Sequence, residues 1–193
     1  MNSWSQTIVR QAKSARSTTV GLVGGSRKAV DRRVLDRLAK SLVSGLREAK
    51  LDPRVLVVRL EIREVFDLIG PTQVDQHLPD LMESPLGRWS HVDIPMPVGR
   101  TAPWTLEQLP KWLPSWKKRF GVIMLDLGPM HLVPSRTIGR LCDSCFVLLG
   151  PDSCGSCEWI QQHMSWHQQS GTQLSGCVLT TFESLTKGRR QVN

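Results

Sequence analysis

The sequence predicts an α/β protein with a doubly wound, mostly parallel sheet between two layers of helices. Short apolar runs alternate with amphipathic helical segments along almost the whole chain. The run Val55-Leu56-Val57-Val58 is continuously apolar, which is typical of a strand covered on both faces. Turns rich in glycine and proline separate the segments, and no internal repeat interrupts their order.

Length, charge and composition favour one domain with basic flanks. The chain has 193 residues and a net charge of +8, and it divides into a peripheral basic segment (1–16), an α/β domain (17–185) and a basic tail (186–193). No apolar run approaches the roughly 18 residues of a membrane helix, and residues 1–6 carry no signal-peptide pattern. We therefore expect a cytoplasmic protein.

The first third of the chain is expected to fold as helix, strand, helix and strand. Residues 1–16 carry one apolar pair, Ile8-Val9, and predict a peripheral helix without a role in the core. A buried strand at 18–23 leads into a glycine turn, in which Ser26 can cap a long helix. Apolar residues at helical spacing define that helix. They are Val30, Val34, Leu35, Leu38, Leu42, Val43 and Leu46. Residues 54–60 then form the second strand.

The remaining elements follow from prolines and apolar runs. Five prolines break residues 65–100 into loops, short helices and a short strand at 91–94. A helix at 104–119 should bend or divide at Pro110 and Pro114. Residues 120–126 form the clearest buried strand, which ends at Asp126. A helix near 134–142, a strand at 145–149, a helix at 154–169 and a strand at 177–182 complete the fold.

A ligand crevice is expected beyond the carboxyl ends of the strands, as in other open α/β sheets. The turn after the first strand supplies glycines and two cations at a helix N-terminus, a combination that can bind an anion. The other interpretation of these residues is a capped turn whose charges are solvated. The candidate crevice residues are Gly24, Gly25, Ser26, Arg27, Lys28 and Asp126.

These turns resemble the ATPase domain of bacterial tyrosine kinases of exopolysaccharide export, within the wider MinD and ParA group of deviant Walker ATPases. The resemblance covers residues 17–183 and is strongest at 120–149, FGVIMLDLGPMHLVPSRTIGRLCDSCFVLL. It implies a P-loop NTPase-like fold. It also implies a partner, a membrane-anchored polysaccharide chain-length regulator or export component, and through it a peripheral place at the inner membrane face.

The phosphate-binding pattern of that family is missing. Val30, Asp31 and Arg32 stand where a P-loop has glycine, lysine and serine or threonine. Arg59 and Glu61 stand where the second element has aspartates. A branched side chain disfavours the loop geometry, and a carboxylate repels a polyphosphate.

The third element keeps only Asp126, and Ser135 replaces the acidic residue of the following switch. The chain also contains no tyrosine, whereas the family phosphorylates a tyrosine-rich tail. We therefore expect a pseudoenzyme with no catalytic residue, no metal and no cofactor, acting as a regulatory or interaction subunit. The alternative is a divergent ATPase or tyrosine kinase, and only that alternative requires ATP and Mg²⁺. A polar strand end that caps a turn is a second interpretation of Asp126.

Two cysteine pairs have the spacing of zinc knuckles, Cys142-x-x-Cys145 and Cys154-x-x-Cys157. The strand between them, at ~3.3 Å per residue, separates the pairs by roughly 15 Å, which argues against one shared metal. The second pair could be a redox pair at a helix N-terminus. Cysteines in polar turns, without a catalytic role, are the other interpretation.

Two further side-chain pairs stand four residues apart on helices. His163 and His167 could share a metal or form a surface or half-buried pair. Trp112 and Trp116 could stack on bases, which together with the basic charge gives a second alternative, a nucleic-acid-binding α/β module. Core packing is the other interpretation of the tryptophans.

Overall fold

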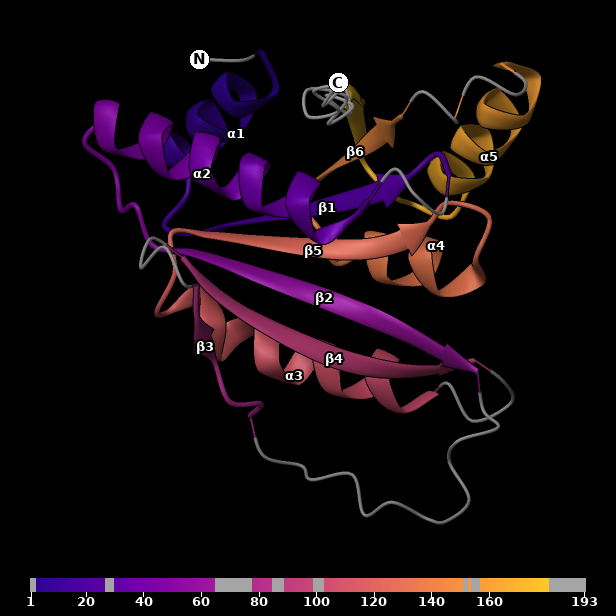
Figure 1. Cartoon of the computed structure of the whole chain (residues 1–193), viewed down its shortest axis with the longest axis horizontal. Coiled ribbons are helices and arrows are strands. Elements are labelled where there is room, and N and C mark those ends of the chain that lie inside the picture. The colour runs from indigo at the N-terminus through magenta and orange to yellow at the C-terminus, as the bar shows by residue number, and fades with distance from the viewer. Residues whose placement is uncertain are drawn as a thin grey trace, which may run out of the picture.

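The computed structural model describes residues 3–26, 30–64, 78–84, 89–98, 103–150, 153 and 157–180. Their strands form one seven-stranded sheet in the order β3-β4-β2-β5-β1-β6-β7 (Figure 1). Every neighbouring pair is parallel except β3 and β4, so the predicted mostly parallel sheet is confirmed. The strands are β1 (Thr18–Gly24), β2 (Val55–Glu64), β3 (Met82–Glu83), β4 (Ser90–Val98), β5 (Val122–Pro129), β6 (Ser144–Leu149) and β7 (Leu174–Leu179).

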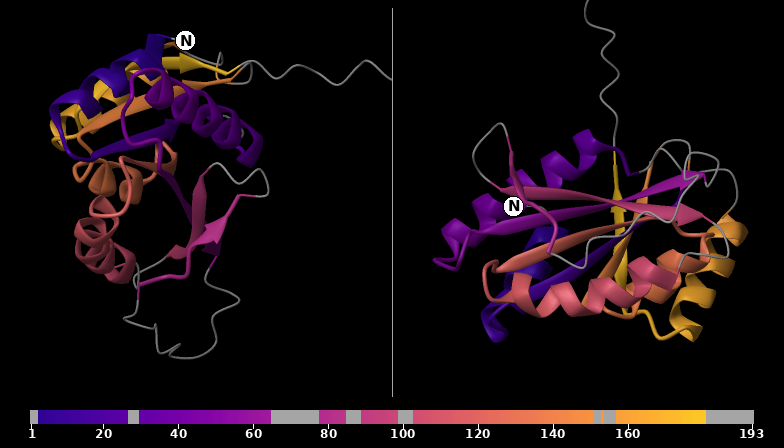
Figure 2. Two further views of the ribbon diagram at one scale, coloured as in Figure 1. Left: turned by 90° about the vertical axis from the view of Figure 1, so that its left-hand side faces the viewer. Right: turned by 90° about the horizontal axis from the view of Figure 1, so that it is seen from below.

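Helices cover both faces of this sheet, which gives the expected three layers (Figures 1 and 2). One face packs against α1 (Ser3–Ser14) and α2 (Arg32–Glu48). The other packs against α3 (Pro103–Lys117), α4 (Val133–Gly139) and α5 (Cys157–Gln169). Within the described residues no helix has both the length and the apolar character needed to cross a membrane.

Strand periodicity decides which side chains meet each helical layer. Val55 and Val57 of β2 join the core under α2, whereas Leu56 and Val58 join the core under α3. The same alternation holds on β5. Because successive side chains point to opposite faces, Arg59 of β2 lies on the α2 face. Asp126 of β5 lies on that face as well.

The N-terminal helix belongs to the core, contrary to the expectation from its sequence. Trp4, Ile8 and Val9 are 7%, 0% and 4% exposed. The Trp4 ring packs edge-on against Phe146 of β6, with 6.5 Å between ring centroids. The expectation was wrong because Trp4 is buried in the same cluster as the pair Ile8-Val9. Three apolar side chains at helical spacing are enough to seat this helix on the sheet.

The long helix α2 begins later than predicted. It starts at Arg32, and its cap is Asp31 rather than Ser26. Five residues therefore separate Gly25 from the cap. This shift moves the predicted glycine turn away from the helix N-terminus, which matters for the candidate anion site.

Three other elements, β4, α3 and β7, also differ from the predicted bounds. β4 extends over nine residues despite Pro95 and Pro97, because β3 pairs with it only at Ser90 and His91. A proline is tolerated where its nitrogen faces an unpaired edge. α3 runs through Pro110 and Pro114 as one helix, so the predicted division does not occur. β7 begins three residues earlier than predicted.

Candidate functional site

Three charged residues form a row across the sheet on the α2 face. Arg59 on β2 is the register partner of Asp93 on β4 and of Asp126 on β5. All three point toward the α2 layer, because each is an even number of residues from a core position of that layer. One guanidinium thus stands between two carboxylate-bearing strands.

Asp126 is the most deeply buried acid of this row. It is 8% exposed, and burial raises its pKa to about 6. Its Oδ1 accepts a hydrogen bond from the backbone N–H of Gly128 at 2.9 Å, and Arg59 also favours the charged form. The nearby carboxylate of Asp93 opposes that effect. The carboxyl group of Asp126 therefore changes charge within two pH units of neutrality.

Asp93 and Arg59 complete the row as a partly buried ion pair. Arg59 Nη1 lies 3.7 Å from Asp93 Oδ1, and the two side chains are 27% and 25% exposed. The Oδ1 atom itself is buried and has no hydrogen-bond partner among the described residues. Two acids and one arginine leave the row with a net charge of −1 when both carboxyl groups are ionised.

The N-terminus of α2 already carries an anion. Asp31 Oδ1 accepts a hydrogen bond from Val34 N at 2.8 Å, and the Asp31 carbonyl accepts one from Leu35 N at 3.1 Å. The first amides of a helix otherwise attract phosphate, with help from the helix dipole. Here the carboxylate of the chain itself takes that position.

Backbone hydrogen bonds attach the predicted glycine turn to the sheet. Gly25 donates its N–H to the Leu148 carbonyl at 2.8 Å. Contrary to the prediction, this amide is therefore not available to bind an anion. Gly24 accepts a hydrogen bond from Met130 N at 2.9 Å. Ser26 Oγ is buried and has no partner among the described residues. The two predicted cations, Arg27 and Lys28, lie outside the described residues.

Close packing explains why glycines occupy this turn. A Cβ atom on Gly24 would lie 2.7 Å from the Ser26 carbonyl oxygen and 3.0 Å from a methyl carbon of Val30. A Cβ atom on Gly25 would lie 2.7 Å from a methyl carbon of Leu149. All three distances are shorter than ordinary van der Waals contact. The glycines therefore have a packing role in this chain.

Ser135, which the family resemblance aligns with an acidic switch residue, has a structural role in this chain. It is fully buried, and its hydroxyl lies 2.6 Å from the Leu127 carbonyl and 2.8 Å from the Pro129 carbonyl. The hydroxyl holds the start of α4 against the end of β5. Glu61, which stands where the family's second element has an aspartate, is the register partner of Pro95 on β4.

The first cysteine pair is a buried packing element. Cys142 and Cys145 are 6% and 0% exposed, and both sulfurs face Gly21 of β1. The contact with Cys145 and burial raise the pKa of Cys142 well above its usual range. Cys157 is exposed at the start of α5, after the carboxyl end of β6, as the length of that strand predicts. Cys154, the other member of the second pair, lies outside the described residues. Among the described residues no cluster has the donors for a metal.

The two histidines of α5 are buried, whereas a surface or half-buried pair was expected. His163 and His167 are 6% and 0% exposed. His167 Nε2 lies 3.0 Å from the Met130 carbonyl, which attaches α5 to the segment after β5. Burial lowers the pKa of both histidines. They are neutral at pH 7 and stabilise the packing of α5.

Two tryptophans border this histidine pair at the surface. Trp159 and Trp166 are 36% and 37% exposed, and their ring centroids lie 4.2 and 4.6 Å from that of His163. Arg136 of α4 lies over the Trp166 ring, 5.4 Å from its centroid. This aromatic patch was not predicted from the sequence, although both tryptophans lie on the same helix as His163. Their seven-residue separation was the available signal.

The other tryptophan pair fills the core. Trp112 and Trp116 are 4% and 0% exposed, with ring centroids 6.0 Å apart at an interplanar angle of 47°. Buried rings cannot stack on bases, so the core-packing interpretation is confirmed. The nucleic-acid alternative therefore loses the tryptophan pair and is left with the basic charge alone.

Comparisons with known proteins agree with this fold. The kinase domain of the Escherichia coli tyrosine kinase ETK superposes with a TM-score of 0.65 at 11% identity, over 97% of this chain and 77% of that one. The BceF tyrosine kinase domain gives 0.62 at 16% identity, over 91% and 73%. A ParA family ATPase from Chlorobium tepidum TLS gives 0.52 at 13% identity, over 86% and 73%.

No family model and no curated protein matches the sequence. The structural likeness therefore shows a P-loop NTPase-like fold that resembles tyrosine kinase and ParA-type domains.

Proposed function

We propose that this chain is a catalytically degenerate P-loop ATPase-type domain that works by binding a partner in polysaccharide synthesis or export. The main support for the proposal is the position of two charged side chains, Asp31 and Arg59, in the predicted crevice. Asp31 caps the helix where a P-loop would hold phosphate, and Arg59 stands beside Asp126 where the fold family places metal-binding acids.

These charges do not fit a magnesium–triphosphate complex. A phosphate at the α2 N-terminus would meet the Asp31 carboxylate, and Coulomb repulsion between two anions grows as water is excluded. Mg²⁺ prefers oxygen ligands in near-octahedral geometry. The Arg59 guanidinium offers no acceptor and repels a second cation. ATP hydrolysis is accordingly not part of the proposed role.

A protein-binding role is supported by the aromatic patch formed by Trp159, Trp166, His163 and Arg136. Tryptophan and arginine are the residues most often responsible for affinity at protein interfaces. Both exposed tryptophans lie on α5, Trp159 next to His131 in the segment after β5 and Trp166 next to Arg136 of α4. The resemblance to export kinases indicates the partner, the cytoplasmic part of a membrane-anchored chain-length regulator. Such a partner would bring the chain to the inner membrane face.

Binding between the purified chain and that regulator segment tests the proposal. We expect association that is unchanged by ATP and Mg²⁺, and that weakens tenfold or more when Trp159→Ala or Trp166→Ala is introduced. Leu179→Ala is the matched control, because Leu179 is apolar and 78% exposed but lies on β7. Nucleotide-dependent association would contradict the proposal.

A further inference from the structure

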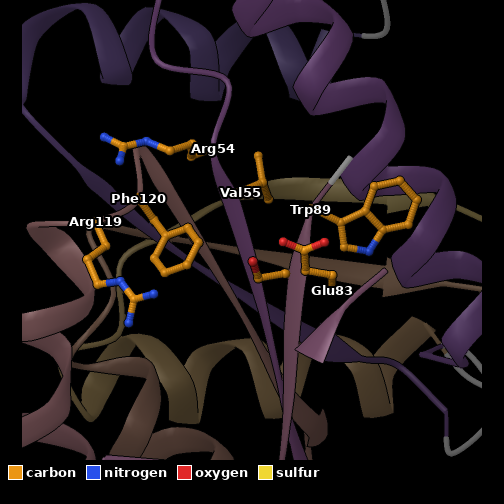
Figure 3. A pocket seen from close by; sticks show the side chains of 7 residues that line it. Arg54, Val55, Glu83, Trp89, Arg119 and Phe120 are labelled. Carbon is orange, nitrogen blue, oxygen red and sulfur yellow. The ribbon is translucent and has the colours of Figure 1, made fainter. Parts of the chain in front are cut away.

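A hollow lies at the amino-terminal ends of the parallel strands, at the opposite end of the sheet from the predicted crevice. It has a volume of about 300 Å³ and is lined by residues from the starts of β2 and β4, from β3 and from the turn before β5 (Figure 3). That size is at the lower limit of ordinary small-molecule sites. Nothing in the proposed function uses this edge.

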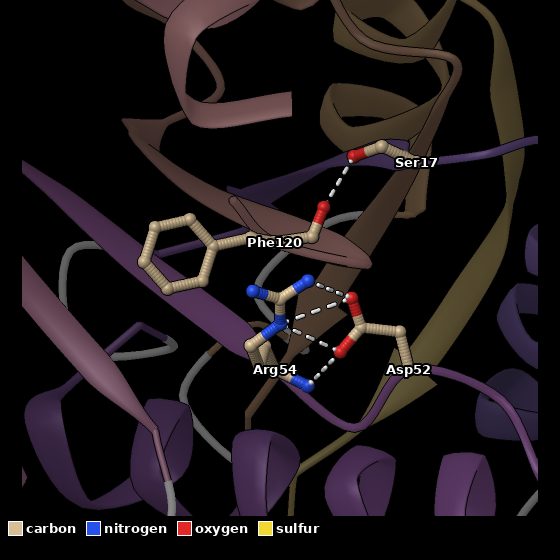
Figure 4. A network of polar contacts seen from close by, with 4 residues as sticks. All are labelled: Ser17, Asp52, Arg54 and Phe120. Carbon is tan, nitrogen blue, oxygen red and sulfur yellow. Dashed lines mark hydrogen bonds and ion pairs between the residues drawn. The ribbon is translucent and has the colours of Figure 1, made fainter. Parts of the chain in front are cut away.

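One wall of the hollow presents two guanidinium groups. Figure 3 shows Arg54 and Arg119 on either side of Phe120. Arg54 is held by Asp52 through a bidentate contact, with Nη2–Oδ2 at 2.7 Å and Nε–Oδ1 at 2.9 Å (Figure 4). Arg119 makes no ion pair with any described residue and lies 5.8 Å from the centroid of the Phe120 ring. Its charge is therefore available to a ligand.

The opposite wall presents an acid and a hydroxyl. Glu83 of β3 is the register partner of Ser90 on β4, so the two side chains lie next to each other in the hollow. Ser84 N donates to the Trp89 carbonyl at 2.9 Å, which closes this hairpin. Glu83, like Arg119, has no ion-pair partner among the described residues.

The backbone under the arginine wall is fixed by the sheet. The Arg54 carbonyl accepts hydrogen bonds from Gly121 N and Val122 N at 3.0 and 3.3 Å. The Phe120 carbonyl accepts one from the Ser17 hydroxyl at 2.7 Å (Figure 4). The wall is therefore formed before a ligand arrives, which lowers the entropy cost of binding.

We propose that this hollow binds a small organic acid that carries one carboxylate and, at its other end, a hydroxyl or ammonium donor. The carboxylate pairs with Arg119, since guanidinium and carboxylate match in geometry and charge. The donor end meets Glu83 and Ser90. Phe120 and Trp89 provide the apolar sides. A phosphate ester fits less well, because its second negative charge faces Glu83.

This site is tested by titrating the protein with defined acids and measuring the NMR chemical shifts of the Phe120 and Ser90 backbone amides. D-Glucuronate supplies a carboxylate with hydroxyls, and γ-aminobutyrate supplies a carboxylate with an ammonium group at its other end. Either result supports the site, and the comparison identifies the donor that Glu83 prefers. D-Glucose lacks the carboxylate and should not bind. Failure of both acids to shift these amides at about 10 mM overturns the proposal.

Variants separate a specific site from general attraction to a basic protein. Arg119→Gln should weaken the binding acid tenfold or more, whereas Lys118→Gln, the same charge change on an exposed neighbour outside the hollow, should not. Glu83→Gln should weaken the acids and strengthen glucose 6-phosphate. Equal effects of Arg119→Gln and Lys118→Gln would overturn the proposal. Because the crevice is at the other edge of the sheet, neither result bears on the proposed ATPase degeneracy.

Discussion

Arg59 and Asp126 are register partners on adjacent parallel strands, and they place a permanent cation next to a nearly buried carboxyl group. The cation stabilises the charge of Asp126 but does not fully offset the cost of its burial, since its pKa is still raised to about 6. The two side chains therefore offset each other's charge in part within the chain itself. The raised pKa of Asp126 also makes the stability of the fold dependent on pH.

Asp126→Asn should stabilise the protein at pH 7. Between pH about 4 and 6 the folded state keeps a proton on Asp126 that the unfolded state has lost, so wild-type stability falls as pH rises through this window. The upper limit of the loss is about 3 kcal/mol, at roughly 1.4 kcal/mol per pKa unit. Urea unfolding at pH 4 and pH 7 should show a difference between variant and wild type only at the higher pH.

Arg59→Gln should raise the pKa of Asp126 further, because the arginine now favours the ionised form. A pH titration of the Asp126 carboxyl carbon by NMR measures this directly. Arg54→Gln is the control, since Arg54 lies at the other end of β2 and pairs with Asp52. A pKa that is unchanged in Arg59→Gln would mean that the two side chains do not interact.

Asp31→Ala should destabilise the protein by about 1 kcal/mol through loss of the α2 cap. Asp31→Asn should retain most of the stability, because its side-chain oxygen still accepts from Val34 N. Asp36→Ala removes the same charge from the same helix without removing a cap, and serves as the control. Equal urea midpoints for the two alanine variants would show that the cap contributes nothing.

Gly21→Ala should destabilise the fold by about 1–3 kcal/mol, because a Cβ atom there would lie 2.5 Å from Cys145 Sγ and 2.9 Å from a methyl carbon of Leu127. Cys145→Ala removes the nearest atom and should restore part of the loss in the double variant. Thermal unfolding of the four proteins in this cycle gives the coupling. Additive effects would contradict the packing described for the thiol pair.

Patterns that repeat along the chain predicted most of the fold, because strand and helix periods are local properties. The apolar runs gave β1, β2, β5 and β6 nearly as observed, and the helical spacing gave the face of α2. The predicted start of α2 was wrong because Ser26 and Asp31 are both good N-cap residues. Only the tertiary hydrogen bond of Gly25 to Leu148 decides between them.

The candidate site was only partly predictable for a similar reason. Arg59 and Asp126 were identified from their strand positions, but Asp93 was not, since its role depends on the register between β4 and β2. Register is set by the whole sheet. The predicted exposed turn is buried because Leu148 and Met130 bond to its backbone, and no local pattern reports such contacts.

Calorimetric titration of the purified chain with ATP and Mg²⁺ tests the central claim, that built-in charges have replaced the phosphate and metal site. We expect no saturable heat at nucleotide concentrations up to about 1 mM. Saturable binding of one nucleotide per chain that requires Mg²⁺, and that is lost in Asp126→Asn, would contradict the claim and would support an active ATPase instead.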